Sequence, residues 1–181
     1  SSDYYQKWDS LINSPQFLEL IHRYGKRVIF CPHRNMQSYS SLFICSDPAV
    51  SILPWEQADI TDLIHQATML ITDYSSIFMD FAYMKRPILY YQFDFKKFRK
   101  QHMSQGYFDY HRDAFGPICE NQEQLLIELT VLLERGCQID AVYQERQRQF
   151  FPVYDQKNCE RTYMAIKEVC NETSNHTFRF H

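Results

Sequence analysis

Residues 70–94 read LITDYSSIFMDFAYMKRPILYYQFD, and they combine two short apolar runs with a polar turn and an amphipathic stretch. The first run ends at the turn TDYSS, after which apolar residues recur at helical spacing. The segment KRP ends this helical pattern, and the second run, ILYY, follows at once. Strand, turn, helix and strand in this order predict a βαβ unit, in which a crossover helix joins two parallel strands.

The turn of this unit is the predicted centre of the chemistry. In βαβ units, ligands gather at the carboxyl ends of the strands, and phosphate groups bind the N–H groups at the start of the helix. Here that position carries the hydroxyls of Ser75 and Ser76 and the carboxylate of Asp73. An alternative reading is structural, because serine at a helix start commonly caps the helix and adds about 1 kcal/mol.

The composition of the chain argues against two classes of protein, those that bind nucleic acid generically and those that span a membrane. The chain has 181 residues with a net charge of −3, which does not favour generic binding to nucleic acid. Its apolar runs are shorter than the roughly 20 residues that a membrane-spanning helix needs, and it shows no secretory signal. Because the chain begins with serine and not methionine, we expect it to be a processed or excised piece.

The six cysteines and seven histidines do not form a metal-binding pattern. No two cysteines have CxxC spacing, and the histidines show neither HxxxH spacing nor a mixed cluster with cysteine. We therefore expect reduced thiols, a cytosolic environment and no metal site.

Along the rest of the chain, short strands alternate with helical patterns. Strands are expected near residues 27–31 and 50–53, in addition to the two strands of the βαβ unit. Helices are expected over 4–24 with a break near Pro15, and then over 59–67, 121–132, 139–150 and 156–170. Such alternation predicts an α/β fold with a Rossmann-like, doubly wound and mostly parallel sheet.

Several segments resemble the CDP-glycerol:poly(glycerophosphate) glycerophosphotransferases of teichoic-acid and capsular polymer synthesis. The resemblance rests on residues 70–94, on FCPHRN at 30–35, and on GYFDY at 106–110 with FGPI at 115–118. It extends to the closing helix that begins with NCER at 158–161. The segments follow one another in the family's order and span most of the chain.

The resemblance implies one lobe of a two-domain GT-B architecture. Residues 1–171 would form the C-terminal domain that binds the nucleotide donor, residues 172–181 a polar frayed tail, and the N-terminal acceptor-side domain would be absent. The implied reaction transfers glycerol phosphate, or another polyol phosphate such as ribitol phosphate, from a CDP-activated donor to a hydroxyl of a polymer or lipid-linked primer, with release of CMP. The fragment alone is expected to have little or no activity. The full-length protein would attach peripherally to the cytoplasmic face of the membrane, and no cofactor or metal is implied.

Within this family frame, three residues are assigned to the donor diphosphate and one to catalysis. Ser75, Ser76 and Arg34 are expected to hold the diphosphate. His33 follows the strand at 27–31, where it could neutralise charge on the departing CMP or donate a hydrogen bond to a phosphate oxygen. A solvated Arg34 and a structural His33 are the alternative readings.

Supporting roles are expected for two carboxylates and one loop. Asp73 would repel a diphosphate, so it is predicted to orient Ser75, a loop N–H group or the glycerol of the donor. Asp80 lies one helical turn after Ser76, where it could hold the turn in place or simply face solvent. The loop containing Gly106, Tyr107 and Phe108 could cover the donor, although both aromatic rings could equally belong to the core.

Two other classes of function stay open. A GT-B glycosyltransferase that uses a nucleotide sugar would keep the fold, but such domains often have a glycine-rich phosphate loop, and this chain has four glycines with none in the turn. A non-catalytic module that binds nucleotides or proteins is also compatible with the fold. Neither the oligomeric state nor the general base can be assigned from the sequence.

Overall fold

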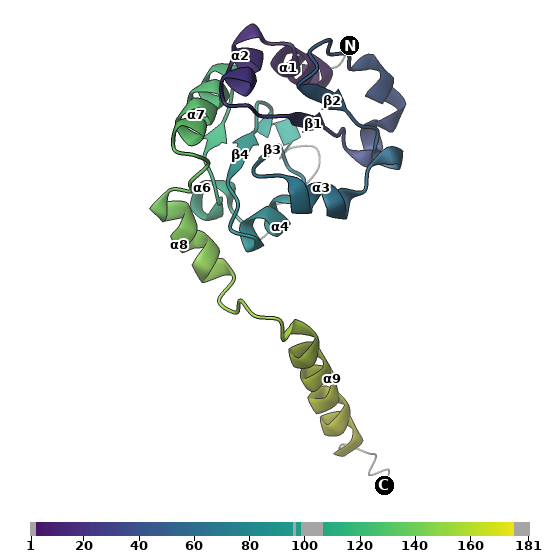
Figure 1. The fold of residues 1–181 in the computed structure, drawn as a ribbon. Helices are drawn as coiled ribbons and strands as arrows, with labels where there is room; N and C mark the ends of the chain where they lie inside the picture. The colour runs from purple at the N-terminus through teal and green to yellow at the C-terminus, as the bar shows by residue number, and fades with distance from the viewer. Residues whose placement is uncertain (1–2, 96, 99–106, 176–181) are drawn as a thin grey trace. The chain divides into compact units, whose positions relative to one another are not determined.

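The expected βαβ unit is present in the computed structural model, which describes residues 3–95, 97–98 and 107–175 (Figure 1). Strand β3 (Leu70–Thr72) leads through the polar turn into helix α4 (Phe78–Tyr83), and β4 (Ile88–Tyr91) returns parallel to β3. Strand β5 (Ile118–Cys119) pairs in parallel with the other edge of β4, which gives the order β3-β4-β5. All four residues of β4 are buried, as expected for a central strand of a parallel sheet.

Alternate residues of β4 face two different groups of helices. Leu89 and Tyr91 belong to the core cluster that α1 (Asp3–Ile12), α2 (Pro15–Arg23) and α7 (Gln122–Glu134) also build. Tyr90 instead packs against Phe78 of α4, with ring centroids 5.5 Å apart. The sheet is therefore covered by helices on both faces, which is the doubly wound arrangement predicted from the sequence (Figure 1).

The strands form two sheets, whereas the sequence predicts one. Strands β1 (Val28–Phe30) and β2 (Val50–Ile52) pair in parallel with each other, and no ladder joins them to β3 within the described residues. Side chains connect the sheets instead. The ring of Trp8 lies 5.7 Å from that of Phe30 in β1 and 5.3 Å from that of Tyr91 in β4. The aromatic packing of Trp8 therefore links the two sheets, in which β1 and β2 have three residues each.

The predicted helix boundaries are largely confirmed, and their caps explain them. Ser14 caps α2, since its hydroxyl accepts the N–H of Phe17 at 3.4 Å, and Pro15 occupies the first turn. Gly25 ends α2 with a φ of +58°. Asn121 caps α7 through the N–H of Gln124 at 2.9 Å. The remaining helices of the described residues are η1 (Arg34–Leu42), η2 (Trp55–Gln57), α3 (Ile60–Gln66), α6 (Tyr110–Asp113), α8 (Ala141–Phe150) and α9 (Asn158–Asn175).

The chain divides into two compact units, one up to Gln149 and the other from Phe150 onward. The first unit contains all five strands of the described residues. The second unit consists mainly of α9, whose exposed side chains include the apolar Tyr163, Met164 and Ile166. The sequence-based boundary at residue 171 stays a prediction.

Arg86 has a structural role that its place in the sequence does not reveal. A cation at the end of a helix such as α4 is expected to meet the dipole of that helix. The guanidinium group of Arg86 instead donates hydrogen bonds to the carbonyl oxygens of Ile64, His65 and Ala67, the last two at 2.9 and 2.5 Å. These carbonyls belong to the last turn of α3 and its cap, so Arg86 ties α3 to the end of α4.

Replacing this guanidinium group should destabilise the protein. We expect Arg86→Met to lower the free energy of unfolding by about 2 kcal/mol, because three carbonyl groups lose a charged donor. The control is Arg148→Met, because Arg148 pairs with Glu145 on the surface with 77% of its side chain exposed. Urea unfolding followed by circular dichroism measures both variants, and equal losses for the two would contradict the assignment.

Candidate functional site

The turn after β3 occupies the carboxyl end of the strand and runs from Asp73 to Ile77. The carbonyl oxygens of Ser75 and Ser76 accept the N–H groups of Phe78 and Met79, at 3.4 and 3.0 Å. Ile77 is the N-cap of α4 and makes no side-chain capping bond. The serines are therefore not capping residues of α4, because the helix begins two residues later than a cap at Ser75 requires and one residue later than a cap at Ser76 requires.

Several hydrogen-bond donors of this turn are unused by the protein. Among the described residues, the backbone N–H groups of Ser75, Ser76 and Ile77 have no hydrogen-bond acceptor, and neither do the two serine hydroxyls. Ser75 is half-buried and Ser76 is exposed. Consecutive backbone N–H groups with adjacent hydroxyls form a concentration of donors that suits an anion with several oxygens, such as a phosphate.

Asp73 is occupied by contacts within the protein. Its Oδ1 accepts the N–H of Tyr74 at 2.6 Å, and its Oδ2 accepts the hydroxyl of Tyr4 in α1 at 2.8 Å. Its backbone carbonyl accepts Nε2 of Gln92, at the end of β4, at 3.0 Å. The bond to the N–H of Tyr74 has the geometry that one of the three expected roles requires, and the supporting role of Asp73 stays a prediction.

Tyr74 also anchors the turn, through its hydroxyl group and its ring. Its hydroxyl donates to Asp94 Oδ1 at 2.7 Å, and its ring stacks on Phe98 with centroids 3.7 Å apart and an interplanar angle of 4°. Burial and the hydrogen bond to Asp94 raise the pKa of Tyr74 well above its ordinary value, so the phenol stays protonated and keeps donating.

Tyr4, Tyr74 and Gln92 belong to this site, although none of them is predicted from the sequence. Gln92 offered a signal in the sequence, because it is a polar residue directly after the apolar run of β4. In the structure its side chain is only 1% exposed, which is unusual for glutamine. Tyr4 offered none, since it lies 69 residues from its partner Asp73. Tyr74 is part of the quoted turn but carries no pattern that distinguishes it from its neighbours.

His33 and Arg34 follow β1, and Arg34 is the first residue of η1. His33 is exposed. A single parallel sheet would bring His33 to the same edge as the turn, but β1 pairs with β2 in a separate sheet. A shared ladder therefore does not bring His33 to the turn, and the catalytic role of His33 stays a prediction.

The other predicted site residues differ in their surroundings. Asp80 is exposed on α4, and its carboxylate has no hydrogen bond or ion pair among the described residues, so its supporting role stays a prediction. Phe108 packs against Phe78 and Phe115, with ring centroids 5.2 and 5.6 Å away, which favours the core reading for this ring. Tyr107 is 81% exposed, and Gly106 lies outside the described residues.

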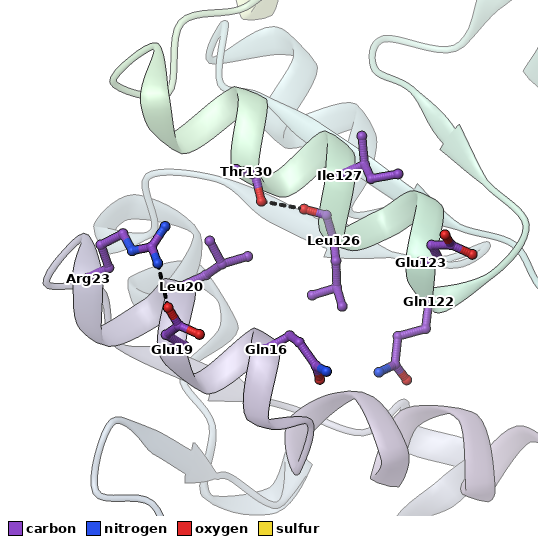
Figure 2. A pocket seen from close by; sticks show the side chains of 9 residues that line it. All are labelled: Gln16, Glu19, Leu20, Arg23, Gln122, Glu123, Leu126, Ile127 and Thr130. Atoms are coloured by element: carbon purple, nitrogen blue, oxygen red, sulfur yellow. Dashed lines mark hydrogen bonds and ion pairs between the residues drawn. The ribbon is translucent and has the colours of Figure 1, made fainter.

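A groove of about 550 Å³ lies elsewhere on the domain, between α2 and α7 (Figure 2). Its walls contain charged, polar and apolar side chains. Arg23 pairs with Glu19 on one side, and the hydroxyl of Thr130 donates to the carbonyl of Leu126 at 2.7 Å on the other. None of its lining residues belongs to the turn after β3, so we separate this groove from the candidate site.

Neither a metal centre nor a membrane-spanning helix is found in the described part of the chain. No cluster of three or more His, Cys, Asp or Glu side chains there could hold a metal ion. In the same residues, no helix combines the length and the apolar character that crossing a bilayer requires.

Comparisons with known proteins agree on one family. The family model of CDP-Glycerol:Poly(glycerophosphate) glycerophosphotransferase matches residues 18–168. The Minor teichoic acid biosynthesis protein GgaB of Bacillus subtilis (strain 168) is 29% identical over 174 residues, which cover 94% of this chain and 18% of that protein. The Teichoic acid glycerol-phosphate transferase of Staphylococcus aureus (strain NCTC 8325 / PS 47) is 41% identical over 68 residues, which cover 38% of this chain and 17% of that protein.

Among solved structures, a variant of the Wall Teichoic Acid Polymerase TagF soaked with CDPG matches with a TM-score of 0.56 at 23% identity. The match covers 93% of this chain and 50% of that chain. It confirms the predicted fold class, a Rossmann-like α/β lobe of the GT-B type. The chain spans less than a fifth of these curated relatives and about half of the solved polymerase.

Proposed function

Because this chain belongs to the CDP-glycerol:poly(glycerophosphate) glycerophosphotransferase family, we propose that it is the donor-binding lobe of an enzyme that transfers glycerol phosphate from CDP-glycerol to a hydroxyl acceptor, with release of CMP. The relative from S. aureus is named a teichoic acid glycerol-phosphate transferase, and the TagF variant was soaked with CDPG, which supports this choice of donor. The acceptor would be a teichoic-acid-like or capsular polymer, or its lipid-linked primer.

The donor diphosphate would bind at the turn after β3. The observation that carries the proposal is the set of unused donors there, namely three consecutive backbone N–H groups from Ser75 to Ile77 and the two serine hydroxyls. Hydrogen bonds from such groups to a charged phosphate are stronger than those between neutral groups. Arg34 would add a positive charge to this site.

Catalysis in this proposal is mainly positioning and charge stabilisation, because the acceptor hydroxyl attacks phosphorus and CMP departs. Donors at the turn would stabilise the phosphoryl oxygens. His33 would neutralise charge on the departing CMP or donate a hydrogen bond to it. Asp80 would support the turn, and Tyr107, with its ring exposed, would cover the donor.

The proposal also covers the domains of the full-length enzyme and its attachment to the membrane. Residues 1–171 would form the donor lobe and residues 172–181 its tail, and a second lobe would contribute the acceptor side and the general base. In support, the TagF structure has about twice the length that this chain matches. Peripheral attachment at the inner face of the membrane would place the active site next to a lipid-linked acceptor.

Calorimetric titration of the 181-residue chain with CDP-glycerol, CDP and UDP tests the proposed donor. We expect weak binding of the two cytidine compounds, weaker binding of UDP, and little or no transferase activity without the second lobe. A preference for UDP would favour a nucleotide-sugar glycosyltransferase instead. Absence of binding to all three compounds would favour a non-catalytic module.

A further inference from the structure

Asp73 lies two residues before the first donor of the turn, Ser75, in a place where a bare negative charge would oppose anion binding. At close range two like charges repel more strongly when water is partly excluded. The structure shows which two groups hold this carboxylate. One carboxylate oxygen faces the N–H of Tyr74, and the other faces the hydroxyl of Tyr4.

Tyr4 is well placed to hold the carboxylate. Its ring is half-buried, with the ring of Phe93 at 5.9 Å and that of Trp8 at 6.4 Å. Burial and the neighbouring Asp73 carboxylate raise the pKa of Tyr4 above its ordinary value, so the hydroxyl stays a donor at neutral pH. Helix α1 thereby contacts the residue that follows β3.

Gln92 holds the same residue through its backbone. Its side chain is 1% exposed, and its Nε2 donates to the carbonyl of Asp73 at 3.0 Å. Its own backbone N–H donates to the carbonyl of Cys119 in β5 at 2.8 Å, which fixes Gln92 to the sheet. A buried amide is costly unless it is hydrogen-bonded, so this contact sets the position of the peptide group after Asp73.

We propose that Tyr4 and Gln92 are positioning residues for the donor site: they hold Asp73 so that its charge points into the protein and the N–H groups from Ser75 to Ile77 point toward the ligand. This inference rests on the proposed function. It assigns a binding role to the first helix of the chain, which contributes no residue to the turn itself.

The substitution Tyr4→Phe removes one hydroxyl and keeps the ring. We expect it to raise the Kd for CDP-glycerol about five- to tenfold, because Asp73 loses one of the two donors that hold its carboxylate. The matched control is Tyr5→Phe in the same helix, because the Tyr5 hydroxyl donates to the carbonyl of Leu42 at 3.0 Å. Both variants should lose similar stability, and only Tyr4→Phe should lose affinity.

A second pair of variants tests whether the effect passes through Asp73. Gln92→Met keeps the length of the side chain without its donor, and it should also raise the Kd for CDP-glycerol. Adding Tyr4→Phe to Asp73→Asn should raise the Kd by less than Tyr4→Phe does alone, since residues that act through one group are not additive.

The outcomes separate this inference from the proposed function. If Tyr4→Phe binds CDP-glycerol as tightly as the wild type does, the inference is wrong and the proposed function still holds. Equal losses of affinity in Tyr4→Phe and Tyr5→Phe also overturn it, because they would show a general effect of stability. A wild-type chain that does not bind CDP-glycerol overturns both.

Discussion

The double substitution Ser75→Ala/Ser76→Ala is expected to weaken CDP-glycerol binding by about 100-fold. Each hydroxyl would donate to a charged phosphate oxygen, and such a hydrogen bond contributes about 1.5–3 kcal/mol, so two of them at the lower end of this range account for a factor of this size. Within the described residues neither hydroxyl has a partner in the protein, so the melting temperature should change little. Calorimetric titration and thermal unfolding of the same samples measure the two effects separately.

The control for this experiment is Thr68→Val, which removes a hydroxyl and keeps the branched shape of the side chain. Thr68 is also exposed, but it precedes β3 and therefore lies at the opposite end of the strand from the turn. Its replacement should leave the Kd unchanged. If the double variant binds CDP-glycerol as tightly as the wild type, the diphosphate is not held by the hydroxyls of Ser75 and Ser76 and the site lies elsewhere.

The βαβ unit and the position of the turn could be predicted because both depend on local pattern. Apolar runs separated by a helical repeat define the strands and the helix, and the turn between them is polar. The residue at which α4 begins could not be predicted in the same way. The adjacent serines suggest a capped helix, whereas Ile77 is the N-cap and neither serine hydroxyl has a partner among the described residues.

The contacts that hold the turn could not be predicted, because they join distant parts of the chain. Tyr4 reaches Asp73 across 69 residues, and Arg86 reaches the carbonyls of α3 across about 20. The contact between the two sheets has the same origin, because it depends on the packing of Trp8 between β1 and β4. Propensity and periodicity do not contain such information.

Gly116→Ala is expected to be strongly destabilising. A β-carbon at this position would lie 1.8 Å from the carbonyl oxygen of Ile88, the first residue of the fully buried strand β4. No side-chain rotation can relieve a clash between two backbones, so β4 and β5 would have to separate. Overpacking in a core typically costs about 1–3 kcal/mol, and we expect about 3 kcal/mol or more here.

Two other glycines provide the comparison. Gly25 and Gly136 have positive φ angles of +58° and +64°, and a β-carbon at either would have no neighbour within 4 Å. Replacing either with alanine should cost about 1 kcal/mol from backbone strain alone. Urea unfolding of the three variants should therefore show one large loss and two small ones. Equal losses of unfolding free energy in the three variants would contradict this prediction. They would show that the close approach of Gly116 to β4 does not make glycine necessary at this position.

Gly116→Ala also tests whether the segment FGPI, which is part of the family resemblance, contributes to the fold or to the donor site. In the structure, Pro117 accepts the N–H of Tyr90 through its carbonyl at 3.0 Å, directly after the close approach of Gly116 to Ile88. Both contacts bring β5 against β4, and neither involves the turn after β3. We therefore expect Gly116→Ala to lose stability and to bind CDP-glycerol normally under conditions in which it remains folded. A folded Gly116→Ala protein with weakened binding would assign this segment to the donor site as well as to the fold.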